Sequence, residues 1–104
     1  MHLDISKYFQ DIVTEEKVRE EIDVFLKIWE RKNEVFNQVS VLPVPGSPPT
    51  GNDRLCIVVF IKNSGTVGKA LLFNAQRQRG FNFCREIGEE SMEEYLPLDL
   101  KKSI

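Results

Sequence analysis

The sequence predicts an α+β fold in which N-terminal amphipathic helices pack on one face of a small antiparallel sheet of three or four strands. Helical periodicity is confined to the first third of the chain, and β-branched apolar runs are confined to the second half. Helices gathered at one end of a chain favour this arrangement over alternating βαβ units. With 104 residues, 41% of them hydrophobic, residues 1–104 are expected to form a single domain.

Residues 1–37 are the predicted helical part. Asp4 can cap a short helix whose apolar residues recur at helical spacing, namely Ile5, Tyr8, Phe9 and Ile12. Thr14 can cap a second, longer helix with Glu15 and Glu16 in its first turn, where the helix dipole favours anions. The apolar stripe of this helix comprises Val18, Ile22, Phe25, Leu26, Trp29 and Phe36.

The remaining chain is predicted as a loop, a group of strands and an acidic tail. Residues 42–53, LPVPGSPPTGND, hold four prolines and two glycines and are expected to form a loop. Residues 54–87 contain three strand-like runs, RLCIVVFIK, VGKALLFN and GFNFCREI, and QVSVL before the loop is a candidate for a further strand. In the acidic segment 88–104, the capping-box pattern SMEE predicts a short helix that Pro97 ends.

Charge is unevenly distributed along the chain. The formal net charge is -2 and the sequence pI is about 5.4, which disfavours a general nucleic-acid binder. Residues 54–85 nevertheless carry six basic side chains and no acid, whereas residues 86–104 carry six acids and two lysines. Such asymmetry can mark an interaction surface if the fold keeps the two blocks apart.

Two motifs suggest nucleic-acid or nucleotide binding, but their contexts argue against both. Arg79-Gly80-Phe81-Asn82-Phe83 resembles the start of the RNP1 signature, whose aromatic residues stack on bases. Only fourteen residues, 65–78, separate it from the strand that would carry the companion motif, too few for that topology. We therefore expect NAQRQRG to form a turn and the phenylalanines to supply core, which leaves Arg77 and Arg79 as an alternative anion-binding pair. NSGTVGKA lacks the first glycine and the Ser or Thr of a P-loop, so a β-turn at NSG is expected instead.

Catalytic and metal-binding constellations are nearly absent, so we predict a protein that is not an enzyme and has no cofactor or metal. His2 is the only histidine and lies near the terminus, which leaves a serine or cysteine nucleophile without a base. Cys56 and Cys84 follow no ligand spacing and are expected to be free buried thiols, unless their strands are neighbours and allow a disulfide.

The acidic C-terminal segment is the candidate partner-binding surface. Acids around an aromatic anchor can steer and hold a basic protein. The predicted partner-binding residues are Glu89, Glu90, Glu93, Glu94, Tyr95 and Asp99. The most concrete function is that of a small inhibitor or immunity-type protein, an antitoxin that occludes the active site of a basic toxin or nuclease.

Two alternatives belong to other classes. A nucleic-acid-binding module would use the basic strands 54–85, and a structural subunit of a homo-oligomer would use an exposed sheet edge or the Trp29 face. No secretory signal is recognisable at the N-terminus and the longest apolar run, CIVVFI, is too short to span a bilayer, so we expect a cytoplasmic protein with no membrane partner.

Overall fold

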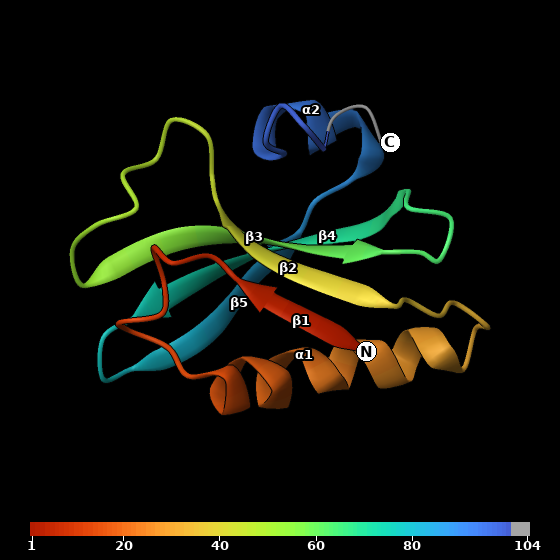
Figure 1. The fold of residues 1–104 in the computed structure, drawn as a ribbon, viewed down its shortest axis with the longest axis horizontal. Coiled ribbons are helices and arrows are strands. Elements are labelled where there is room, and N and C mark those ends of the chain that lie inside the picture. The colour runs from red at the N-terminus through yellow and green to blue at the C-terminus, as the bar shows by residue number, and fades with distance from the viewer. Residues whose placement is uncertain (101–104) are drawn as a thin grey trace.

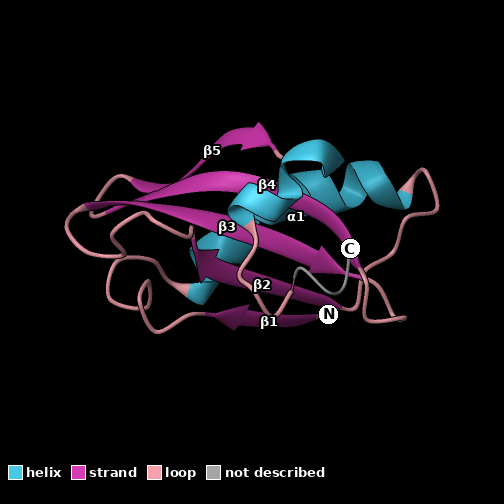
Figure 2. Ribbon diagram, turned by 90° about the horizontal axis from the view of Figure 1, so that it is seen from above, coloured by secondary structure: helices cyan, strands magenta, loops and turns pink. Residues whose placement is uncertain are grey.

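The computed structural model describes residues 1–100, which form one five-stranded mixed sheet between two helical layers (Figure 1). The strands follow chain order across the sheet, β1-β2-β3-β4-β5, with β1 parallel to β2 and every other pair antiparallel (Figure 2). Their bounds are β1 His2–Ile5, β2 Gln38–Pro43, β3 Asp53–Ile61, β4 Val67–Gln76 and β5 Gly80–Glu86.

The predicted fold class is therefore wrong in the sheet and in the first helix. The sheet has five strands and is mixed, and a single long helix, α1 (Glu15–Glu30), precedes the second strand. The segment expected to form a helix from Asp4 begins instead as β1, because its backbone bonds to β2. His2 N–H donates to Asn37 O and Ser6 N–H donates to Val41 O, both at 3.0 Å. These long-range bonds outweigh the local helical pattern, and residues 7–12 follow as turns.

The start of α1 at Thr14 is confirmed, but the helix ends earlier than its apolar stripe predicted. The Thr14 hydroxyl accepts a hydrogen bond from Lys17 N–H at 3.1 Å and caps the first turn. At the other end Asn33 takes a left-handed conformation (φ 62°), and Glu34 N–H donates to Trp29 O at 2.9 Å. Phe36 therefore reaches the core from the loop after α1, where it packs on Trp29.

Both faces of the sheet are covered along most of β3, which explains why this strand is apolar almost throughout. Cys56, Val58 and Phe60 belong to a core between the sheet and α1. Ile57 and Val59 point to the other face and join a second core with the C-terminal segment. Figure 1 shows α1 below the sheet and the C-terminal helix above it.

Tight turns join the last three strands. The NSG turn is confirmed: Gly65 N–H donates to Lys62 O at 2.9 Å, and Gly65 adopts φ +87°, which favours glycine. The next turn contains Gln78 and Gly80, both with positive φ. A register shift between Leu72 and Phe73 places an irregularity in the pairing of β4 with β5.

The chain then crosses to the upper face through η1 (Glu89–Ser91) and α2 (Met92–Tyr95). The short helix before Pro97 is confirmed, although Ser91 makes no side-chain capping bond. Residues 101–104 of the predicted acidic segment lie outside the described residues. Within residues 1–100, no helix combines the length and apolarity needed to cross a membrane.

Candidate functional site

The predicted acidic residues form an exposed group on the upper face of the sheet. We call the five carboxylates of this group the C-terminal acidic surface; they are Glu89, Glu90, Glu93, Glu94 and Asp99. All five residues are exposed, and none forms an ion pair with another residue of the described chain. Their negative charge is therefore not neutralised by ion pairs within residues 1–100.

Buried neighbours hold this surface in place. Met92 is 5% exposed and Leu96 is fully buried, and both pack in the second core with Ile57 and Val59 of β3. Because these apolar residues alternate with the glutamates along η1 and α2, burial of one set fixes the outward direction of the other. The acidic side chains thus project from a docked segment.

Tyr95 is half-buried and already has an intramolecular partner. The Arg85 guanidinium lies over its ring, 5.0 Å from the centroid, and donates a hydrogen bond to its hydroxyl. The ring also packs against the second core. Tyr95 therefore lies beside the acidic surface, where a partner would meet it together with Arg85.

A hollow of about 260 Å³ adjoins the acidic surface, between β4 and the C-terminal segment. Val67, Gly68 and Met92 supply its apolar wall, and Glu89 also lines it. An apolar wall beside a carboxylate suits the aliphatic stem and charged end of a lysine or arginine side chain.

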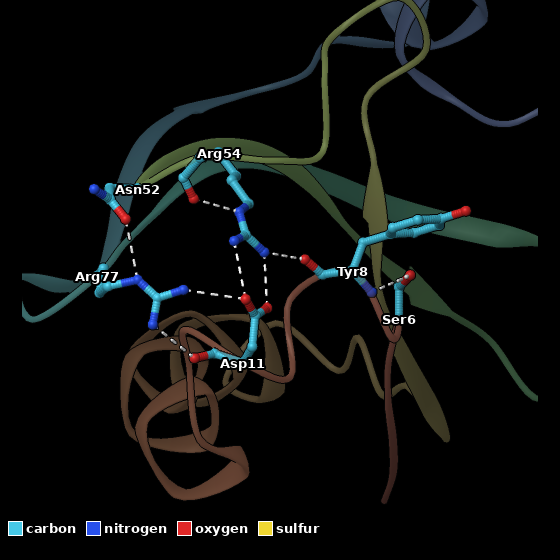
Figure 3. Close-up of polar contacts among 7 residues, drawn as sticks. Ser6, Tyr8, Asp11, Asn52, Arg54 and Arg77 are labelled. Atoms are coloured by element: carbon cyan, nitrogen blue, oxygen red, sulfur yellow. Dashed lines mark hydrogen bonds and ion pairs between the residues drawn. The ribbon is translucent and has the colours of Figure 1, made fainter.

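The predicted anion-binding arginines are not equivalent. Arg77 donates to the Asp11 carboxylate at 3.1 Å and to the Asn52 side-chain oxygen at 3.0 Å (Figure 3). Arg79 is exposed and forms no ion pair within residues 1–100. A hollow of about 490 Å³ lies between them, but Asp53 also lines it. Arg79 is therefore the more available of the two for an anionic partner.

Asp11 is the centre of a polar cluster that also contains Arg54 (Figure 3). The Arg54 side chain is only 8% exposed and contacts both Asp11 carboxylate oxygens, at 2.7 and 3.0 Å. Its other bonds go to Tyr8 O at 2.6 Å and Gly51 O at 2.7 Å, so the buried guanidinium is well satisfied. The cluster joins the turns before α1 to the start of β3 and to the turn after β4.

The cluster has a clear electrostatic signature. The hydrogen bond from Arg54 is the main cause that lowers the pKa of Asp11 from 3.8 to about 2, and the charge of Arg77 contributes less. The same bond raises the pKa of Arg54. Asp11 therefore remains a carboxylate at neutral pH, and the cluster has the character of a structural ion pair.

Other cations of the basic strands are also engaged. Lys69 lies 3.7 Å from a Glu34 oxygen and 3.8 Å from a Glu86 oxygen, and its ammonium is 5.7 Å from the centroid of the Trp29 ring. With Arg54, Arg77 and Arg85 bound as described, Lys62 and Arg79 are the cations of 54–85 without an ion pair or an aromatic partner in residues 1–100. They belong to turns at opposite ends of β4.

The aromatic residues around this turn contribute to the core to different extents. Phe73 and Phe81 are fully buried and stack with ring centroids 4.4 Å apart and an interplanar angle of 11°. Phe83 is 46% exposed and contacts Phe25 of α1, with ring centroids 4.8 Å apart. The core prediction is thus confirmed for Phe73 and Phe81 and holds only in part for Phe83.

Two further predictions concerned cysteine and tryptophan. Cys56 and Cys84 are both free, but only Cys56 is buried, so the expectation of burial is wrong for Cys84. Their strands lie on either side of β4, about 10 Å apart, too far for a disulfide.

Trp29 is 7% exposed and packs on Phe60, so the sheet already covers its apolar face. Among the described residues no group of His, Cys, Asp and Glu side chains is placed to hold a metal ion.

Asp11 and Asn52 were missed by the sequence reasoning. Asp11 lies 43 positions from Arg54 and 66 from Arg77, so no local pattern connects them. The one available signal was Arg54 itself. It is a charged residue at the start of an apolar strand, and a buried arginine requires an anionic partner.

Comparisons with models of protein families, with curated proteins and with solved structures found no match.

Proposed function

We propose that this protein is a non-enzymatic protein-binding domain whose partner is basic. Its most concrete form is a cytoplasmic inhibitor or immunity-type protein that neutralises a basic toxin or nuclease. The observation that carries the proposal is the C-terminal acidic surface, five exposed carboxylates without ion pairs on a segment docked by Met92 and Leu96. Carboxylates held in a fixed array can take the places that substrate phosphates occupy in a basic active site.

The proposed mechanism is steric and electrostatic occlusion. Long-range attraction between the acidic surface and a basic cleft speeds encounter, and close contact then excludes substrate. The hollow beside Glu89 would take a lysine or arginine side chain of the partner, and Tyr95 with Arg85 would form the neighbouring contact. A docked segment loses less conformational entropy on binding than a free tail, which favours affinity.

The test begins with capture of partners from the native lysate on the tagged protein, with and without added nuclease. The wild type is compared with the variant Glu90→Lys, Glu93→Lys, Glu94→Lys. The matched control reverses three acidic residues away from this surface, Glu21→Lys, Asp53→Lys, Glu86→Lys. A basic protein retained after nuclease treatment by the wild type and the control, but lost by the C-terminal variant, supports the proposal.

Association kinetics with the captured protein then test the mechanism. Reversal of Glu90, Glu93 and Glu94 should slow association about tenfold or more and weaken its dependence on salt. An association rate that is unchanged in this variant would refute the occlusion mechanism.

The two alternatives remain separate outcomes of the same experiment. Partners that disappear with nuclease would favour nucleic-acid binding, in which Arg79 is the first residue to replace because Arg77 is held by Asp11. A mass that rises with protein concentration in light scattering would favour a homo-oligomer.

A further inference from the structure

A groove runs along one side of α1 beside the free edge of β1. It consists of three adjoining hollows of about 380, 410 and 360 Å³. The first lies between β1 and the start of α1, and the other two continue along the helix and share Met1, Asp23 and Leu26. We call this surface the α1–β1 groove.

The groove has an apolar floor and an acidic rim. Ile22 is fully buried beneath it, and Leu26 and Phe36 add partly and largely buried apolar surface. Six carboxylate residues line it along the helix and the following loop, namely Glu15, Glu16, Glu20, Asp23, Glu30 and Glu34. Arg19 is the single base among the lining residues, and Glu15 holds it at 2.8 Å. Charge complementarity therefore calls for a basic occupant with some apolar side chains.

The edge of β1 offers backbone groups as well as charge. His2 and Ser6 direct their N–H groups toward β2, as residues of one parity do in a parallel pair. The N–H and C=O groups of Leu3 and Ile5 therefore point away from β2, toward the groove side of the sheet. Unpaired edge groups of this kind form hydrogen bonds with an added extended segment.

Gln10 shows that one of these groups already attracts a donor. Its side-chain amide donates to Ile5 O at 2.9 Å, the bond that a backbone N–H of an added strand would make. Within residues 1–100, Leu3 N–H and Ile5 N–H donate to no neighbouring strand and Leu3 C=O accepts from none, since β1 ends the sheet. Removal of the Gln10 amide would therefore free one more acceptor for an added strand.

The opposite edge of the sheet lacks this combination. β5 carries the register shift opposite Leu72 and Phe73, and such irregularities interrupt the ladder at a sheet edge. Phe83 and Arg85 of β5 are occupied by Phe25 and Tyr95. Strand addition is thus better supported at β1.

We propose that the α1–β1 groove binds a basic, extended segment of another protein, which adds to β1 as a sixth strand. Its backbone pairs with Leu3 and Ile5, its apolar side chains lie over Ile22 and Leu26, and its lysines or arginines meet the acidic rim. This site is distinct from the C-terminal acidic surface, because α1 and α2 cover opposite faces of the sheet (Figure 1).

The probe for this site is a short labelled peptide of alternating lysine and valine. Its control is the same peptide with N-methyl groups on alternate backbone nitrogens, which keep the charge and remove strand pairing. Binding is followed by fluorescence anisotropy, and amide hydrogen exchange of the whole protein locates the contact. We expect slowed exchange at Leu3 and Ile5, and weaker binding of the methylated peptide by about tenfold or more.

Three variants test separately the acidic rim, the net charge of the protein and the Gln10 side chain. Glu16→Gln, Glu20→Gln, Glu30→Gln should weaken binding of the unmodified peptide by about tenfold. The control Glu21→Gln, Asp53→Asn, Glu86→Gln makes the same charge change outside both proposed sites and should leave binding unchanged. Gln10→Ala should strengthen binding, because Ile5 O becomes free. Urea midpoints equal to the wild type confirm that the variants are folded.

Several results would overturn the proposal. These are no binding at millimolar peptide, equal affinity for the methylated peptide, or protection that appears at β5 instead of β1. An equal loss of affinity in the groove variant and in its control would show attraction by net charge alone and would also refute a defined groove site. Because the groove and the C-terminal acidic surface lie on different faces, failure here leaves the test of that surface intact.

Discussion

Phe81 and Phe83 are two residues apart on β5, yet the structure predicts very different costs for their removal. Phe81 is fully buried and stacked on Phe73, so Phe81→Ala loses the whole transfer free energy of the side chain and leaves a cavity. Such truncations cost about 3–5 kcal/mol. Phe83 is 46% exposed, so Phe83→Ala should lose about half of the ~1.5–3 kcal/mol of full burial, without an enclosed cavity.

Urea unfolding can measure this difference with a built-in probe. Trp29 is the only tryptophan and packs in the core on Phe60, so its fluorescence should report global unfolding. For slopes of about 1–3 kcal/mol per molar urea, Phe81→Ala should lower the midpoint by about 1 M or more, and Phe83→Ala clearly less. A domain of this length has about 5–15 kcal/mol of stability, so over most of this range Phe81→Ala should still be folded in the absence of urea.

The difference between Phe81→Ala and Phe83→Ala tests whether these aromatic residues belong to the core or are available for stacking on bases. A residue reserved for stacking on bases would be replaced with little loss of stability, whereas a core residue would not. Equal midpoint shifts for the two variants, or a larger shift for Phe83→Ala, would refute the assignment of Phe81 to the core.

Three other outcomes follow from the packing and the polar cluster. The folded-state pKa of Asp11 is depressed, so its carboxylate stabilises the fold above pH 3.8 and loses this effect as pH falls toward 2. The difference in urea midpoint between wild type and Asp11→Asn should therefore shrink over that range, and a constant difference would contradict the ion-pair assignment. Cys84 should react with a thiol reagent in the folded protein, whereas Cys56, whose pKa burial raises to about 12, should react only after unfolding; mass spectrometry distinguishes the two sites. Gly68→Ala would place a methyl group against the Phe36 ring, closer than van der Waals contact allows, and should destabilise the fold by about 1–3 kcal/mol in urea unfolding; an unchanged midpoint would mean that the ring moves freely.

The elements that the sequence predicted well are those dictated by neighbouring residues. The cap at Thr14 and the turn at Gly65 depend on a few adjacent positions. β3 is marked by a nearly continuous β-branched run, and β4 and β5 by apolar and aromatic residues between polar turns. β1 was missed because its four residues gain their hydrogen bonds from β2, more than thirty positions away, across the helix that a parallel pair requires. Its short apolar pattern fits a helix equally well without that partner.

The candidate site divides in the same way. The exposure of Glu89, Glu90, Glu93 and Glu94 follows from a hydrophilic stretch interrupted by Met92 and Leu96, a local pattern. The pairing of the arginines does not, because Asp11 reaches Arg54 and Arg77 only through the folded chain. Fewer basic side chains of residues 54–85 are therefore available to an anionic partner than the sequence indicates, because Arg54 is buried and paired with Asp11.

The fold itself restricts where a macromolecular partner can bind. α1 covers one face of the sheet, and the C-terminal segment covers the other face around Ile57 and Val59. The surfaces open to a partner are therefore the outer sides of these two layers, the two sheet edges and the end of the second face where Leu55 and Asn82 are exposed. On both candidate surfaces the carboxylates lie beside apolar hollows, at Met92 and at Leu26, and this combination distinguishes them from an ordinary solvated face. A basic protein that required both surfaces would have to wrap around β1. The sharpest geometric test is therefore the combined effect, on one captured partner, of replacing the glutamates of the C-terminal acidic surface and those of the α1–β1 groove.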